Sequence, residues 1–389
     1  MSNLIREARD ARGWTSARLN LELRRAASQL RVTTASEASL RVMISRWEND
    51  KEIPDASYRL LLQKAFNLPA ATLGFERDGV TEASGVPLTA LVQRGSSRLR
   101  LSDNTLNYFR GQFVEHVRMD NLVGPGLVID TVSIQYRQLR VLAERGPAET
   151  MQLAARFAEL AGWLYQDSGD PSSALKYTDE SVDLAEAAGD VGLSAYTTMR
   201  KSNVLSAAGD HHRASLTAGK ALTLAEKNAP YLMAVCLRQA ALTHAYLGHE
   251  TTAQAALDQA LELTTPVVES NNELSPYCTT SYVQMEGALC SLVLGQPASA
   301  VEACIDALAA WPAEIVRDKA LCLARLAIGQ LDLYQLDEAC ESAMLAIEHV
   351  RASPSARTLH MLQLIARRVL PLKQARAVRQ FRQALATVA

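Results

Sequence analysis

The feature that most constrains this chain is a turn that recurs five times at nearly regular spacing. Successive turns are 40, 39, 47 and 39 residues apart in the 389-residue sequence. They lie at Gly169-Asp170, Gly209-Asp210, Gly248-His249, Gly295-Gln296 and Tyr334-Gln335. A recurring turn of this kind predicts five consecutive helix–turn–helix units, each stacked on its neighbours.

Three positions of each unit hold small side chains, which let two helices pack with their backbones close together. Seven residues before the turn they are Gly162, Ser202, Ala241, Ala288 and Ala327. Five residues after it they are Ala174, Ala214, Ala253, Ala300 and Ala339. Twelve residues after it they are Ser181, Ala221, Ala260, Ala307 and Ala346. A generic helical bundle is the alternative, but it does not explain five recurrences.

These offsets resemble the tetratricopeptide repeat, whose consensus places small residues around a Gly-Asp turn. Segments 177–184 and 253–263 come closest to it, and the resemblance extends from about residue 150 to residue 352. The units exceed the usual period of about 34 residues, so longer helices or loops are expected. Helix pairs at 104–145 and 358–388 are expected to cap the two ends. The predicted fold class is all-α.

The stretch from Ser39 to Lys51 predicts a short helix with two unlike faces. The apolar side, which we expect to be buried, carries Leu40, Met43, Ile44 and Trp47. The other side carries Arg41, Val42, Ser45, Arg46 and Asn49. Ser39 is a candidate N-cap, and Asn49 is a candidate left-handed stop.

Motifs on both sides of this stretch resemble the xenobiotic-response-element type of helix-turn-helix domain. They are Arg12-Gly13-Trp14-Thr15, Ile44 to Asn49, Pro54 with Tyr58, Leu61 and Leu62, and Leu73-Gly74-Phe75. The interval between Trp14 and Trp47 is longer than this family usually has, so the start of the recognition helix stays open by a residue or two. A small helical domain with a merely solvated arginine face is the alternative.

The resemblance implies that the two-faced helix reads a DNA major groove, where arginine can bind guanine through two parallel hydrogen bonds. The residues expected to face base edges are Ser39, Arg41, Val42, Ser45 and Arg46. Those expected to contact phosphates are Thr15, Ser16, Asn49 and Lys51. A homodimer would place two such helices about 34–36 Å apart on a palindromic operator of double-stranded DNA.

Charge is divided unevenly along the chain. Residues 1–75 carry 12 Lys and Arg against 8 Asp and Glu, which gives +4, whereas the remainder carries −6 and the whole chain −2. A basic first segment fits DNA contact confined to the N-terminus. No apolar run is long enough for a membrane helix, and residues 1–12 lack the apolar region of a signal peptide, so a soluble, cytoplasmic protein is expected.

Neither a metal site nor catalysis is indicated. Cys236, Cys278, Cys290, Cys304, Cys322 and Cys340 form no Cys-x-x-Cys pair, and small buried thiols account for them. Phosphate-binding, dinucleotide-binding, nucleophile-elbow and His-Glu-x-x-His motifs are all missing from the sequence. No cofactor, metal or enzymatic activity is therefore expected.

Composition also divides the chain into domains. Residues 76–100 are rich in Gly, Ser, Thr and Pro, as expected for a linker. The predicted domains are a helix-turn-helix domain at 1–75 and a helical repeat domain with capping helices at 101–389.

A helix-turn-helix domain joined to such repeats resembles peptide-responsive regulators of Gram-positive bacteria, in which the concave face of the repeats binds a signal peptide. In this repeat family, the residues that line the groove usually stand 13, 10, 6 and 3 positions before each turn. The same positions in this chain give the candidate ligand-binding residues. They are Arg156, Glu159, Trp163, Gln166, Tyr196, Asn203, Arg238 and Tyr282. The polar end of the groove is expected in the first three units, because apolar side chains dominate the last two. Trp163 fits a core role as well as a ligand platform.

Two hypotheses remain open at this stage. In the first, the protein is a DNA-binding transcriptional regulator whose repeats bind a signal peptide or small ligand and mediate dimerisation. In the second, it is a protein-interaction scaffold whose DNA binding is constitutive or secondary, since solenoids are general protein-binding surfaces.

Overall fold

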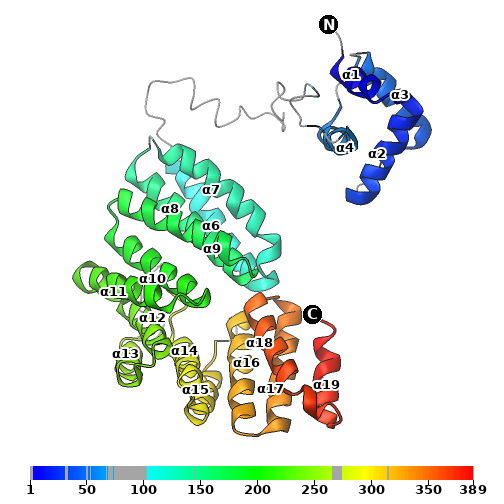
Figure 1. The fold of residues 1–389 in the computed structure, drawn as a ribbon. Coiled ribbons are helices and arrows are strands. Elements are labelled where there is room, and N and C mark those ends of the chain that lie inside the picture. The colour runs from blue at the N-terminus through cyan, green and yellow to red at the C-terminus, as the bar shows by residue number, and fades with distance from the viewer. Residues whose placement is uncertain are drawn as a thin grey trace. The chain divides into compact units, whose positions relative to one another are not determined.

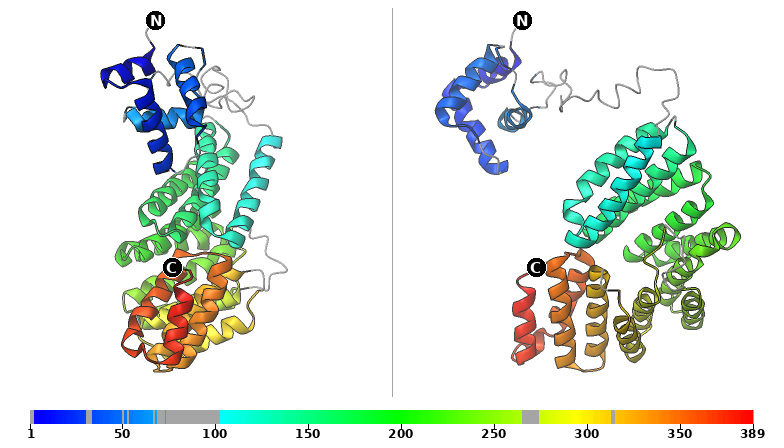
Figure 2. Two further views of the ribbon diagram at one scale, coloured as in Figure 1. Left: turned by 90° about the vertical axis from the view of Figure 1, so that its right-hand side faces the viewer. Right: turned by 180° about the vertical axis from the view of Figure 1, so that it is seen from behind.

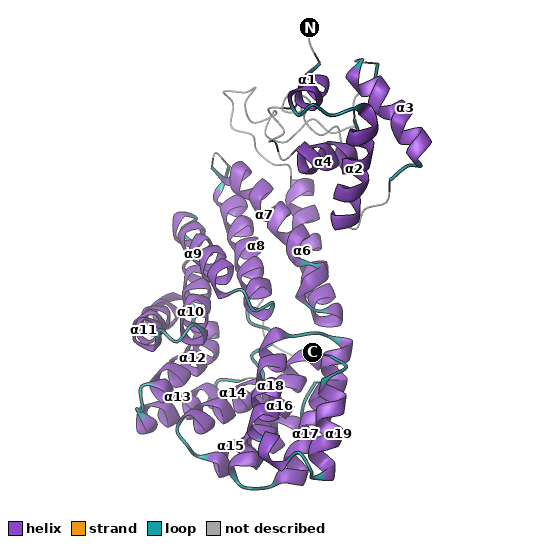
Figure 3. Ribbon diagram, turned by 45° about the vertical axis from the view of Figure 1, so that its right-hand side comes forward, coloured by secondary structure: helices purple, strands orange, loops and turns teal. Residues whose placement is uncertain are grey.

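The structure is a computed structural model, and its described residues form two compact units, 1–94 and 95–389 (Figure 1). The described residues are 3–30, 34–49, 51–52, 54–66, 68, 73, 103–144, 146–264, 274–312 and 315–388. Their regular elements are all helices, joined by turns and loops (Figure 3). The predicted linker at 76–100 and the boundary at residue 75 lie outside the described residues.

Unit 1 consists of four helices packed around one apolar core. They are α1 Leu4–Ala11, α2 Ser16–Leu30, α3 Glu37–Glu48 and α4 Ala56–Phe66. As expected from the sequence, the buried side of α3 carries Leu40, Ile44 and Trp47, which meet Leu19 and Leu23 of α2 in that core. Gly13 adopts a left-handed φ of +62° after α1, and the Thr15 hydroxyl accepts a hydrogen bond from the Arg18 amide to cap α2.

The ends of α3 differ from the predicted ones. Ser36, not Ser39, is the N-cap, and its hydroxyl accepts a hydrogen bond from the Ser39 amide at 3.3 Å. Asn49 follows the helix with a φ of −110°, so it is not a left-handed stop. The N-cap of the helix therefore lies three residues before the predicted one, which resolves the uncertainty left by the long interval between Trp14 and Trp47.

Unit 2 is a tetratricopeptide-like stack of antiparallel helix pairs (Figure 1). The first pair is α6 Asp103–Val123 and α7 Ile129–Ala143, with the short helix η3 Pro125–Leu127 between them. The five predicted units follow as α8 Ala148–Asp167 with α9 Pro171–Ala187, α10 Val191–Ala207 with α11 His211–Asn228, α12 Met233–Tyr246 with α13 Glu250–Glu262, α14 Thr280–Val293 with α15 Pro297–Ala309, and α16 Val316–Asp332 with α17 Leu336–Ala352. The short helix η4 Pro230–Leu232 precedes α12, and α18 Ala356–Arg368, η5 Leu370–Leu372 and α19 Arg376–Leu385 end the chain.

The small residues of the repeat lie where the two helices of each unit touch. The fifteen positions are buried in the structure, as the sequence predicted. At Gly162 a side chain would not fit, because a Cβ there would lie 2.5 Å from the Thr178 hydroxyl of the partner helix. Four of the five turns use a glycine at positive φ, and Tyr334 occupies the same backbone conformation in the fifth, at φ +62°.

The two expected caps do not lie at separate ends, because the first helix pair meets the last units (Figure 2). Helix α6 contacts α16, and a Cβ on Gly124 would lie 2.6 Å from the Pro354 carbonyl oxygen. We call this junction of α6, the end of α8, α16 and the start of α18 the seam. It closes the repeats into a ring.

Candidate functional site

The outward face of α3 presents the residues predicted to face base edges. Ser39, Arg41, Val42, Ser45 and Arg46 are all exposed, and Val42 is 55% exposed. Arg41 pairs with Glu37 at 3.1 Å and Arg46 with Glu52 at 3.3 Å. Exposed ion pairs of this kind contribute little, about 0–1 kcal/mol, so both guanidinium groups can exchange their carboxylates for another anion.

The predicted phosphate contacts are less uniform. Thr15 and Lys51 are exposed and Ser16 is half-buried. The amide of Asn49 is already used within the unit, because Arg6 Nη2 donates to its Oδ1 at 2.7 Å and its Nδ2 donates to the Ser45 carbonyl at 2.6 Å. Asn49 therefore holds the end of α3 against α1, a role that the sequence did not indicate.

Buried polar contacts fix α3 relative to the other helices of unit 1. Arg9 Nε donates to Glu48 Oε1 at 2.6 Å, and Arg9 Nη1 donates to the Trp14 carbonyl at 2.7 Å. At the other end of α3, Asn20 Nδ2 donates to the Glu37 carbonyl at 3.0 Å. Both ends of the candidate recognition helix are thereby tied to the core, which presents its outward face rigidly.

In unit 2, the inner helices α8, α10 and α12 carry a connected polar network. Arg200 lies at its centre, with Nε donating to Glu159 at 2.9 Å and Nη2 donating to Gln166 at 3.2 Å. Asn203 continues the network by donating to Gln239 Oε1 at 3.1 Å. The structure thus brings together the predicted residues Glu159, Gln166 and Asn203, through two residues that were not predicted.

Arg238 is the most enclosed cation of this network, with no exposed surface. Its Nη1 donates to Gln239 Oε1 at 2.7 Å and lies 3.5 Å from Glu286, while its Nε has no hydrogen-bond partner. Glu286 is shared with Arg325 at 2.8 Å. Burial alone would raise the pKa of Glu286, but Arg325 and Arg238 outweigh it and hold that pKa below its ordinary value.

The remaining predicted ligand residues lie apart from this network or at its edge. Arg156 stacks over the Phe113 ring of α6 at 4.4 Å, and Trp163 donates from Nε1 to Asp120 at 3.1 Å in the seam. Tyr196 and Tyr282 lie near Arg200 and Arg238, and burial raises the pKa of both phenols.

One position accounts for the residues of the polar network that the prediction missed. Nine residues before each turn stand Arg200, Gln239, Glu286 and Arg325 in units two to five. This position was not among the groove offsets carried over from the repeat family. As a result, the expectation of an apolar groove in the last two units is wrong, because the buried Glu286–Arg325 pair lies there.

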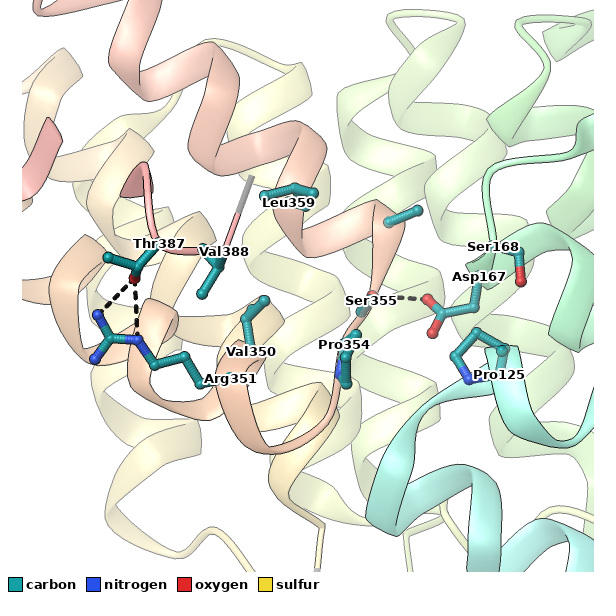
Figure 4. A pocket seen from close by; sticks show the side chains of 12 residues that line it. Pro125, Asp167, Ser168, Val350, Arg351, Pro354, Ser355, Leu359, Thr387 and Val388 are labelled. Atoms are coloured by element: carbon teal, nitrogen blue, oxygen red, sulfur yellow. Dashed lines mark hydrogen bonds between the residues drawn. The ribbon is translucent and has the colours of Figure 1, made fainter. Parts of the chain in front are cut away.

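The seam holds a second cluster of buried charge. Arg317 of α16 binds Asp120 of α6 through two contacts of 2.5 Å, and Asp167 accepts hydrogen bonds from Ser355 at 2.7 Å and Arg357 at 2.9 Å. A pocket of about 470 Å³ opens beside it (Figure 4). Its lining includes Pro125, Asp167, Arg351, Ser355 and Thr387, and Arg351 donates to Thr387 at 2.7 Å.

Two further observations bear on the compositional expectations. Five of the six cysteines are buried and Cys278 is half-buried. Over the described residues, no helix combines the length and apolar character that crossing a membrane requires.

Comparison with known proteins shows a fold likeness only. The chain matches the structure of Rap protein complexed with competence and sporulation factor, with a TM-score of 0.50, 13% identity, and coverage of 96% of this chain and 98% of that one. It also aligns with the tetratricopeptide domain of P58(IPK), at a TM-score of 0.27 and 13% identity over 93% of this chain and 79% of that one. No protein-family model and no curated protein sequence matches the chain.

Proposed function

We propose that the protein is a sequence-specific DNA-binding transcriptional regulator whose helical repeats bind a signal peptide or small ligand. The observation that carries this proposal is the outward face of α3, where two arginines, two serines and a valine are exposed on a helix fixed at both ends. We propose a non-catalytic role for the whole chain.

The chemistry of that face suits a major groove. A guanidinium group can donate two parallel hydrogen bonds to the O6 and N7 atoms of guanine, and a small apolar side chain such as Val42 can contact a thymine methyl group. Arg41 and Arg46 now pair only with exposed carboxylates. If the arginines bound base edges instead, Glu37 and Glu52 would lose their partners, but both carboxylates are exposed and would be solvated.

The ligand half of the proposal rests on the inner helices of unit 2. Their polar side chains form one network from Glu159 to Arg325, instead of the apolar interior of an ordinary helix stack. The structurally similar Rap protein was solved in complex with a factor. We infer that a ligand of this chain contacts the inner helices of unit 2, with Asn203 and Arg238 among its partners.

We also propose that the protein acts as a homodimer. Helix α6 exposes Tyr108, Val114 and Leu122 at 60–61% each, and apolar side chains gathered on one helix can form an interface with a second copy. Light scattering on the full chain tests this part, and a monomer at micromolar concentration would contradict it.

Selection of bound DNA from a random pool by the full chain tests the function itself. We expect an enriched palindrome, because a symmetric dimer binds two equivalent half-sites. If no sequence is enriched even at low ionic strength, where phosphate contacts are strongest, DNA recognition by α3 is refuted.

A further inference from the structure

The connection between α13 and α14 is the irregular element of the repeat. The turns on either side of it are 47 residues apart, against 39 or 40 elsewhere. Its described part, Leu274 to Thr279, does not run along the outside of the stack. It lies instead against helices of the first three units, which carry much of the polar network.

Leu274 makes the most distant of these contacts. It packs against a cluster formed by Ala155 of α8, Ala185 of α9 and Leu193 of α10. These residues precede Leu274 by 81 or more positions in the sequence. An aliphatic side chain of the connection therefore packs where α8, α9 and α10 of the first two units meet.

Tyr277 packs against α10 and α12 beside the polar network. Its hydroxyl lies 3.4 Å from that of Tyr196 on α10, and its ring meets the Tyr282 ring of α14 edge-on at 5.1 Å. Arg200 and Arg238 lie close enough to act on its phenol electrostatically. The carbonyl of Tyr277 accepts a hydrogen bond from the Thr279 amide at 2.8 Å, and that of Ser275 accepts one from the Cys278 amide at 3.1 Å, so a compact turn presents the ring.

We propose that Leu274 to Thr279 is a built-in occupant of the ligand groove, and that the ligand is a peptide with an aliphatic and an aromatic residue three positions apart. Such a peptide would replace Leu274 on the Ala155 cluster and Tyr277 between Tyr196 and Tyr282. This inference deepens the proposed function, since it rests on the ligand-binding role of unit 2 and not on DNA binding.

The groove suits an aromatic ring with a polar tip. Tyr282 offers the Tyr277 ring edge-on aromatic packing, the Tyr196 hydroxyl offers its phenol a hydrogen bond, and Arg200 and Arg238 act on that phenol electrostatically. The orphaned Nε of the fully buried Arg238 is a further donor that the built-in segment leaves unused. A ligand carbonyl or carboxylate placed there would satisfy it.

The tether makes the segment an effective competitor. A segment joined to its own site acts at an effective concentration of the order of millimolar, so an external peptide binds more weakly than the groove itself would allow. Weakening the segment should therefore strengthen binding of a peptide added from outside.

The first experiment measures that competition by calorimetry. The probe is an acetylated heptapeptide with the sequence of Leu274 to Thr280, carrying Cys278→Ser. We expect it to bind the Leu274→Ala/Tyr277→Ala protein about tenfold or more tightly than the unaltered chain. The matched control is Pro276→Ala, which changes an exposed residue of the same segment, and it should bind like the unaltered chain. A peptide with Tyr277→Ala should bind none of the proteins measurably.

A second experiment uses the unaltered chain and needs no folded variant. Cys278 is the one half-buried cysteine, and it lies within the segment. Millimolar heptapeptide should accelerate alkylation of Cys278, followed by mass spectrometry, at least severalfold, and should leave the buried Cys236 unaffected.

The outcomes separate this inference from the proposed function. Equal affinity for all three proteins, no binding to any of them, or Cys278 alkylation that the peptide does not change would overturn the built-in occupant. Displacement of the segment in a chain that selects no DNA would keep the inference and refute the regulator.

Discussion

Arginine has opposite surroundings in the two units of this chain. In unit 1, Arg41 and Arg46 extend from α3 into solvent, with their side chains about 60% exposed. In unit 2, Arg200, Arg238 and Arg317 are buried against carboxylates and amides of other helices. The exposed arginines contribute little to the stability of the fold and can therefore contact a partner. The buried arginines hold helices together.

The energies expected for the two kinds differ severalfold. An exposed pair contributes about 0–1 kcal/mol, because water and salt screen it. Removing one partner of a buried pair costs about 3–5 kcal/mol, because the other charge stays buried without compensation. Substitutions of arginine by alanine therefore measure directly which kind a position belongs to.

The largest effect is expected for Arg317→Ala at the seam. The substitution leaves Asp120 buried without its two 2.5 Å contacts, and we expect a loss of about 3–5 kcal/mol in the free energy of unfolding of unit 2. Hydrogen exchange followed by mass spectrometry should show lost protection in α6 and α16. Arg368→Ala, which removes a half-exposed pair with Asp332, is the control and should cost less than about 1 kcal/mol. Equal losses in the two variants would contradict the comparison.

An effect on binding without one on folding is expected for Arg41→Ala and Arg46→Ala. Each should weaken binding to the selected operator by about 1–3 kcal/mol, if that arginine contacts guanine, and relax the base preference at that position. The free energy of unfolding should stay within about 0.5 kcal/mol of the unaltered chain. Gel shifts against Arg25→Ala, an exposed arginine of α2, check this. Full affinity in both α3 variants would remove that face from the interface.

Acid should affect the enclosed charges of unit 2. Because Arg325 and Arg238 hold the pKa of Glu286 below its ordinary value, the folded state favours the carboxylate. The stability that this group contributes is present above about pH 4.5 and is lost as the pH falls through the folded pKa. Burial raises the pKa of Asp318, so that group titrates with the opposite sign. Thermal melting between about pH 6 and pH 3 should therefore show a shallower acid limb for Glu286→Gln than for the unaltered chain. Parallel limbs would mean that Glu286 has no such role.

The smallest effect is expected for Glu52→Gln on the exposed side. The substitution frees Arg46 from a 3.3 Å pair and should change the free energy of unfolding by less than about 1 kcal/mol. DNA affinity should stay equal or rise slightly, since a negative charge near the phosphates is removed. Denaturant titration and gel shifts measure the two quantities. A large loss of stability would mean that Arg46 holds the fold together, as the buried arginines of unit 2 do.

Much of this arrangement could be predicted from local patterns. The small residues around each turn predicted which helix faces touch, because close backbone approach tolerates only small side chains at Ala174 or Ala214. The apolar side of α3 likewise followed from helical periodicity. These features depend on neighbours in sequence, and the structure confirms them.

Some features escaped prediction because the local pattern allows two answers, and others because they depend on residues distant in sequence. Ser36 caps α3 where Ser39 was predicted, because both serines satisfy the local pattern. The role of the position nine residues before each turn depends on contact with the neighbouring unit, as when Arg200 donates to Glu159 and Gln166. Pairing of Asp120 with Arg317 across 197 residues follows from how the repeats curve, and no local motif encodes that.

The seam has a consequence for how this fold can change length. An open stack of repeats tolerates one more or one fewer copy, since each copy touches only its neighbours. Here the first helix pair must meet the last units. A duplicated or deleted copy would therefore separate Asp120 from Arg317 and Gly124 from Pro354. Closure thus fixes the number of copies in this architecture, and a chain with one copy more or fewer is expected to lack these paired residues.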